Sequence, residues 1–155
     1  MRTLLETRGI VVVARRSPLA PVALHDRGSL RVSALGAFEP GMEEHRILGI
    51  EIALNAPGLG PEQGRHYLDV HEIEALLQGL FLLEQVGSAP KPGFESAADY
   101  TTVEGFTVGV DVDARGSRFW VEGGRGKRVR LGIDPARIET LRQRLQEARA
   151  KLFSR

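Results

Sequence analysis

Two similar helix starts constrain the fold of this sequence more than any other feature. Asp69 and Asp134 each follow a short apolar, strand-like segment, where an aspartate can accept hydrogen bonds from the free backbone N–H groups of a helix's first turn. Glu72 stands three residues after Asp69, which is the spacing of a capping box, and Pro135 stands at a first helical position, which needs no N–H donor. The sequence therefore predicts two helices that begin directly after these aspartates.

Apolar residues recur at helical spacing after both aspartates, which predicts helices near residues 70–86 and 135–152. The apolar residues of the first helix are Ile73, Leu76, Leu77, Leu80, Phe81 and Leu83. Those of the second helix are Ile138, Leu141, Leu145, Ala148 and Leu152. Because the first stripe is wide, we expect the first helix to be buried on more than one side.

Alternating apolar and polar residues, separated by glycine-containing turns, precede each helix. The segment 9–15 contains the β-branched run Ile10–Val13, which predicts a buried strand. Further strands are expected at 22–25, 30–33, 45–54 and 65–68, and then at 100–103, 106–113, 118–122 and 128–133. The expected fold class is α+β, with two antiparallel sheets and two main helices.

The two halves also correspond around their helix starts. Aligning the two aspartates places Glu74 on Glu139 and Gln78 on Gln143, matches that a strand-to-helix junction does not require by itself. We therefore predict a tandem repeat of a strands-then-helix unit, in which two packed halves cover sheet faces that one helix cannot cover alone. The expected boundaries are 9–86 for the first repeat, 87–97 for a linker and 98–153 for the second repeat, within one pseudo-symmetric domain, 1–155.

Composition and charge exclude several classes of protein. The chain has no cysteine, which excludes disulfides and thiolate catalysis, and its formal net charge is only +1. Its apolar runs are far shorter than the ~20 residues that a membrane-spanning helix needs. Glu6 and Arg8 interrupt the segment that would be apolar in a signal peptide. We expect a cytoplasmic protein with no membrane partner.

Catalytic signatures are missing from the sequence. There is no Gly-x-Ser-x-Gly elbow, and Gly58–Gly60 precedes a strand, where a dinucleotide-binding loop would precede a helix. Lys127 is followed by Arg128 and a strand, where a nucleotide P-loop would have Ser or Thr and a helix. His66, Asp69 and His71 are residues of types that bind metals, but they lack the i, i+4 spacing of a pair of ligands on one helix face. We expect no catalytic residue, no metal and no cofactor.

The second half is similar to a known group of proteins. Phe106–Val112, the glycine-rich basic hairpin Gly124–Arg128, the strand Val129–Leu131 and the helix start Asp134–Leu145 resemble the transcriptional positive-cofactor and Whirly families of single-stranded-DNA-binding proteins. In the first family such a hairpin leads into the last strand and helix, and in Whirly proteins the unit occurs twice. The resemblance implies single-stranded-DNA binding by the second half, since the corresponding loop of the first half carries Glu62 and no Lys or Arg.

Strand alternation places a tryptophan among arginines on one face of the second half. If Val108 and Val110 point into the core, Trp120 points outward, and an exposed ring beside guanidinium groups is typical of a platform on which bases stack. The predicted nucleic-acid-binding residues are Arg118, Trp120, Arg125, Lys127, Arg128 and Arg130. The expected partner is single-stranded DNA or RNA.

Two alternatives remain open at this stage. The arginines of this face can instead pair across strands with Asp111, Asp113 and Glu122 while Trp120 covers a sheet edge. The chain can also be a protein-interaction or scaffold domain, which forms a homo-oligomer through the face of helix 70–86 around Leu77 and Phe81.

Overall fold

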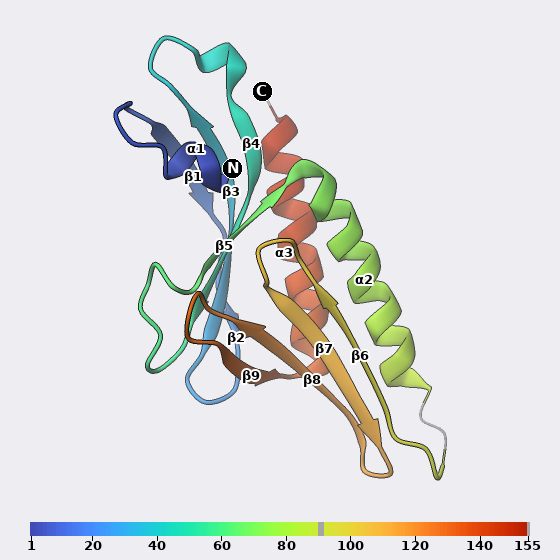
Figure 1. Ribbon diagram of the computed structural model, residues 1–155. Coiled ribbons are helices and arrows are strands. Elements are labelled where there is room, and N and C mark those ends of the chain that lie inside the picture. The colour runs from blue at the N-terminus through green and yellow to red at the C-terminus, as the bar shows by residue number, and fades with distance from the viewer. Residues whose placement is uncertain (90–91, 155) are drawn as a thin grey trace.

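The computed structural model describes residues 1–89 and 92–154, and these form an α+β fold with two antiparallel sheets, as predicted (Figure 1). The first sheet contains β1 (Val13–Pro18), β2 (Val22–Ala23), β3 (Ser29–Phe38), β4 (Ile47–Asn55) and β5 (Arg65–Asp69). The second contains β6 (Ser96–Thr101), β7 (Thr107–Asp113), β8 (Gly116–Gly123) and β9 (Val129–Ile133). The helical segments are α1 (Arg2–Leu5), the 3₁₀ turn η1 (Glu43–His45), and the two main helices α2 (Val70–Ser88) and α3 (Pro135–Phe153).

Both sheets have the same connectivity. The strands follow one another in the orders β1-β3-β4-β5 and β6-β7-β8-β9, with the short β2 paired to β3, and a main helix follows each last strand. One row of partners crosses the first sheet through Ala34, Ile50 and Leu68. The equivalent row of the second sheet consists of Val110, Phe119 and Ile133. The tandem repeat itself stays a prediction, because any antiparallel meander followed by a helix has this connectivity.

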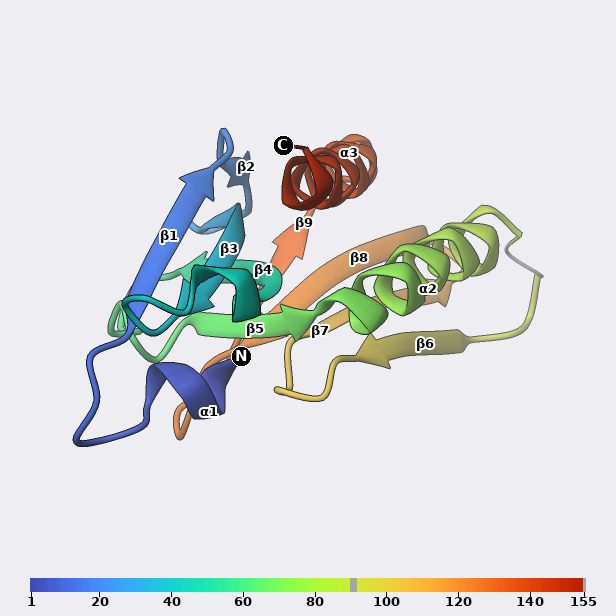
Figure 2. The same cartoon turned by 90° about the horizontal axis from the view of Figure 1, so that it is seen from above.

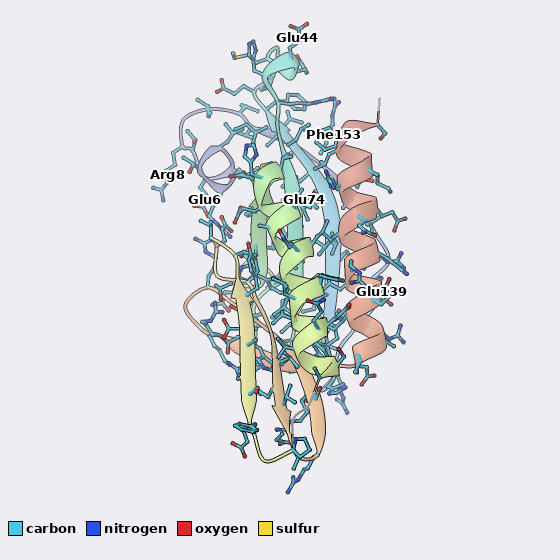
Figure 3. The ribbon with its side chains drawn as sticks, turned by 90° about the vertical axis from the view of Figure 1, so that its right-hand side faces the viewer. Glu6, Arg8, Glu44, Glu74, Glu139 and Phe153 are labelled. Carbon is cyan, nitrogen blue, oxygen red and sulfur yellow. The ribbon has the colours of Figure 1, made fainter. Side chains whose placement is uncertain are left out.

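Each main helix packs mainly on the sheet of the other half, and α2 also contacts β4 and β5 of its own half. Figures 1 and 2 show α3 beside β3 and β4, whereas α2 lies against β6, β7 and β8. The two helices also contact each other, and Figure 3 shows Glu74 on α2 and Glu139 on α3 in this layer. Fully buried residues such as Leu76 on α2 and Leu141 on α3 join the two sheets in one hydrophobic core. The two halves therefore share a core, and neither sheet is covered by its own helix alone.

The predicted helix starts are confirmed. Asp69 and Glu72 form a capping box, in which the backbone N–H of Asp69 donates to the Glu72 carboxylate over 3.0 Å. Pro135 occupies the first turn of α3 after Asp134. The Asp134 carboxylate makes no capping hydrogen bond and lies instead 2.8 Å from Nε2 of His25, which attaches the β2–β3 turn to the start of α3.

The predicted buried strand over residues 9–15 is wrong. β1 begins at Val13, and Val11 is 70% exposed. Val13 pairs with Phe38, which is the last residue of β3, so residues before Val13 have no strand to pair with. The β-branched run therefore indicates where an edge strand begins rather than a buried one.

The predicted linker also differs from the structure. Gly87 still belongs to α2 and β6 already starts at Ser96, so the predicted linker is too long, and its residues 90–91 lie outside the described residues. A β-carbon at Gly87 would lie 2.7 Å from the Phe119 ring, so close packing explains this glycine within a helix.

The broad apolar stripe of α2 is not buried on every side. Phe81, which the stripe predicts as buried, is 52% exposed because α2 meets the sheet on one side only.

Candidate nucleic-acid interface

The face of β6–β9 that points away from α2 carries most of the predicted binding residues. Trp120 on β8 pairs with Gly109 on β7 and with Gly132 on β9. Because side chains alternate between the two faces of a strand, residues two positions away from Trp120, Gly109 and Gly132 lie on the same face as Trp120, as predicted. We call this face the outer surface of the second sheet and define it by Asp111, Asp113, Arg118, Trp120, Glu122, Arg128 and Arg130.

Trp120 is not the exposed platform that the sequence predicts. Its side chain is only 8% exposed. A β-carbon at Gly109 would overlap the indole, so the ring lies flat over this glycine, and the guanidinium carbon of Arg130 lies over the ring at 3.6 Å from its centroid. The glycine on β7 leaves room for the ring, and Arg130 covers it. Trp120 is also on an interior strand, so it does not cover a sheet edge.

The arginines of this surface are paired across strands, as the alternative interpretation expects. The Glu122 carboxylate accepts hydrogen bonds from Nε of Arg130 over 3.1 Å and from Nη2 of Arg128 over 3.1 Å. Arg118 donates to Asp113 over 2.8 Å. Partial burial raises the pKa of Glu122, but the hydrogen bonds from Arg130 and Arg128 outweigh it, so this pKa lies below its usual value. Glu122 is thus charged at neutral pH and competes with any phosphate for two arginines.

Arg125 and Lys127 of the basic hairpin make their polar contacts with the first half. Nη1 of Arg125 lies 3.0 Å from the Glu6 carboxylate, and Nζ of Lys127 donates to the Gly58 carbonyl over 3.3 Å. The backbone N–H of Arg125 donates to the Gln63 carbonyl over 2.9 Å. The structure therefore brings Arg118, Trp120, Arg128 and Arg130 together, while Arg125 and Lys127 fasten the hairpin to the loop between β4 and β5 and to the segment after α1.

A buried histidine holds this hairpin, and the sequence analysis did not identify that role. Nε2 of His66 accepts the Gly124 N–H over 3.1 Å, so Nδ1 carries the proton and donates to the Glu104 carbonyl over 3.3 Å. Burial lowers the pKa of His66, which favours this neutral form. Arg2 in turn binds the Glu104 carboxylate through two contacts of 2.7 Å. These contacts join positions far apart in the chain, so no local sequence pattern reveals them.

A hollow of about 440 Å³ lies beside Trp120. Its lining includes His25, Arg118, Phe119, Trp120, Arg130 and Asp134. This volume is in the range of small-ligand sites. Nε1 of Trp120 is buried and has no hydrogen-bond partner among the described residues. The hollow thus combines two guanidinium groups, an apolar wall and an unsatisfied donor in that wall.

The face of α2 that points away from the sheets carries exposed apolar residues. Phe81 and Leu82 are each 52% exposed, whereas Leu77 is half-buried against the core. In the alignment of the two helix starts, Phe81 and Leu82 correspond to Gln146 and Glu147 of α3. The two helices therefore differ in their solvent-facing residues.

Neither a metal site among the described residues nor a related protein assigns a function to this chain. Among residues 1–89 and 92–154, no group of three His, Cys, Asp or Glu side chains is placed to hold a metal ion. No helix in this part of the chain is long and apolar enough to cross a membrane. No family model matches the sequence, and no curated protein matches it.

Proposed function

We propose that this protein is a non-catalytic module that binds single-stranded nucleic acid through the outer surface of the second sheet. The observation that carries the proposal is the stack of Arg130 on Trp120, in which the Arg130 side chain remains 52% exposed. Unpaired bases stack on guanidinium planes as well as on aromatic rings. A base therefore stacks on Arg130, and Trp120 acts as the support that holds the guanidinium flat.

The hollow beside this stack gives the base a place to enter. Arg118 and Arg130 line it, so a phosphate next to the base has two guanidinium groups within the same surface. Nε1 of Trp120 offers a donor that a base carbonyl can satisfy once the ring shifts, and an unsatisfied buried donor costs about 1–3 kcal/mol.

The carboxylates of this surface set the strength of binding. Glu122 occupies Arg128 and Arg130, and Asp113 occupies Arg118, so a phosphate has to replace these partners. We therefore expect modest affinity that falls as salt rises, because each phosphate contact releases counterions.

The test is a titration of a fluorescein-labelled oligothymidylate without a terminal phosphate, followed by anisotropy at low and at physiological salt. Trp120 is the chain's only tryptophan, so its fluorescence reports the same event. Arg130→Lys keeps the charge and removes the plane, and should weaken binding about five-fold or more. The matched control is Arg149→Lys, which makes the same charge-conserving change in the helical layer, where Arg149 pairs with Glu74. The proposal fails if wild type does not bind at low salt, or if both variants behave alike.

A subunit interface on α2 is the second candidate, in which Phe81 and Leu82 pack against a second copy of this chain. The supporting observation is that α3 carries Gln146 and Glu147 at the corresponding positions, as a solvent-facing helix should. Light scattering of wild type and Phe81→Glu tests it. A dimer that Phe81→Glu converts to a monomer supports this candidate, and a wild-type monomer rejects it.

A further inference from the structure

A second hollow, of about 430 Å³, lies where β1 and β3 meet the last turn of α3. We call it the β1–α3 groove and define it by Arg15, Arg16, Phe38, Arg46, Leu48 and Lys151. It lies at the opposite end of α3 from the hollow beside Trp120, which Pro135 lines. The two hollows are therefore separate, roughly 25 Å apart along a helix that rises 1.5 Å per residue.

The groove is surrounded by positive charge. Four of its lining residues are cations, and no carboxylate is among those that the structure describes around it. Arg16 is bound by Glu51 over 2.9 Å, and Nζ of Lys151 lies 3.2 Å from the Ser17 hydroxyl. Arg15 and Arg46 have no carboxylate partner within residues 1–89 and 92–154. Unlike the arginines around Trp120, these two are available to an anion.

The floor of the groove is apolar. Phe38, Leu48 and Leu152 line it, and Arg15 lies over the Phe38 ring at 5.0 Å from its centroid. Gly36 adds space, since a β-carbon there would meet only Leu48, at 3.6 Å. A bare inorganic anion would leave this floor uncovered, so the ligand needs a flat or apolar body beside its charge.

We propose that the β1–α3 groove binds a nucleotide, with its phosphates between Arg15, Arg46 and Lys151 and its base on the Phe38 and Leu48 floor. Phosphate fits better than a carboxylate, because it carries more charge and offers several oxygens to guanidinium forks. A base fits better than a long acyl chain, because a hollow of this volume is at the small end of ligand sites and half of its lining is polar. This site is independent of the proposed function.

Calorimetry of the full chain with adenosine diphosphate, adenosine and pyrophosphate tests the proposal. We expect the diphosphate to bind more tightly than either fragment. Arg15→Gln and Arg46→Gln should each weaken it about ten-fold, the value of one lost charged hydrogen bond. The matched control is Arg31→Gln, since Arg31 is on β3 outside the groove lining and should leave binding unchanged. Pyrophosphate binding as tightly as the diphosphate would overturn the assignment to a nucleotide.

Two further variants locate the site. Gly36→Val fills the floor with a residue that strands favour, and should abolish binding while the circular dichroism spectrum stays unchanged. Unchanged affinity in Gly36→Val places the ligand elsewhere and rejects the proposal. Arg46→Gln should not affect oligothymidylate binding and Arg130→Lys should not affect the diphosphate, so failure at one site is distinct from failure at the other.

Discussion

The two sheets carry different residues at the centre of the face that points away from the two main helices. Ile50 and Phe119 occupy equivalent rows of the two sheets, and Glu51 follows Ile50 in the chain as Trp120 follows Phe119. Both side chains are buried, and each is covered by an arginine, Arg16 over Glu51 and Arg130 over Trp120. Two sheets with the same connectivity thus bury a carboxylate in one case and an indole in the other.

The neighbours explain the difference. Glu51 lies between Ser33 and Tyr67, which fill the surface on both sides, whereas Trp120 lies between Gly109 and Gly132. α1 also packs against β3, and Figure 2 shows it beside the first sheet. The second sheet has no such cover among the described residues, and its outer surface carries the larger hollow beside Trp120. Cross-strand neighbours, rather than the central residue, decide what each surface can do.

Removing Trp120 should destabilise the protein more than any other change on the two sheet surfaces. Trp120→Ala deletes a buried aromatic ring and leaves a cavity over Gly109, so we expect the free energy of unfolding to fall by about 3–5 kcal/mol. Urea unfolding followed by circular dichroism measures it. Trp120→Phe keeps an aromatic ring and should lose less than half as much, and equal losses would contradict the flat packing of the indole.

The buried ion pair of the first sheet should respond unequally to removal of its two partners. Arg16→Gln leaves the 4%-exposed Glu51 carboxylate without its cation, and should lower the free energy of unfolding by about 2–3 kcal/mol. Glu51→Gln leaves a partly exposed arginine that water can solvate, and should cost less than about 1 kcal/mol. Thermal unfolding of both variants checks the order, and the reverse order would show that Glu51 is not effectively buried.

Sequence reasoning succeeded where structure depends on neighbours in the chain. The capping box of Asp69 and Glu72 is local, and so is the alternation that puts Val108 and Val110 in the core. It failed for Trp120, because the burial of this ring depends on the register that brings Gly109 beside it. Strand alternation predicts the face of a side chain but not what covers it.

The same limit applies to the ends of elements and to the site. Ile10 has strong strand propensity, yet β3 ends too early to pair with it. Arg15 and Arg46 are ordinary surface arginines in the sequence, and only the meeting of β1 with α3 gathers them around a groove. Such long-range placement leaves no signal in a single sequence.

Acid should weaken the link between the two halves at His66. Because burial lowers its pKa below the ordinary 6.5, the unfolded chain binds the proton more readily than the folded chain does. The stability that neutral His66 provides is therefore complete above pH 6.5 and is lost as pH falls from there through the folded pKa. Unfolding measured across this range should show the loss, and His66→Asn should flatten it. An equally steep curve in His66→Asn would assign the loss to other groups.

Releasing the arginines of the second sheet should have the smallest effect, and in the opposite direction. Glu122→Gln removes the charge that holds Arg128 and Arg130, so oligothymidylate binding should tighten about two- to five-fold, in line with the strength of exposed ion pairs. Its salt dependence should steepen, because two more cations then face phosphate. The control is Glu139→Gln on α3, which removes the same charge from the helical layer shown in Figure 3. Equal tightening in both variants would show that net charge alone explains the effect. Tightening in Glu122→Gln alone would place the bound oligothymidylate on the surface that Arg130 and Trp120 form.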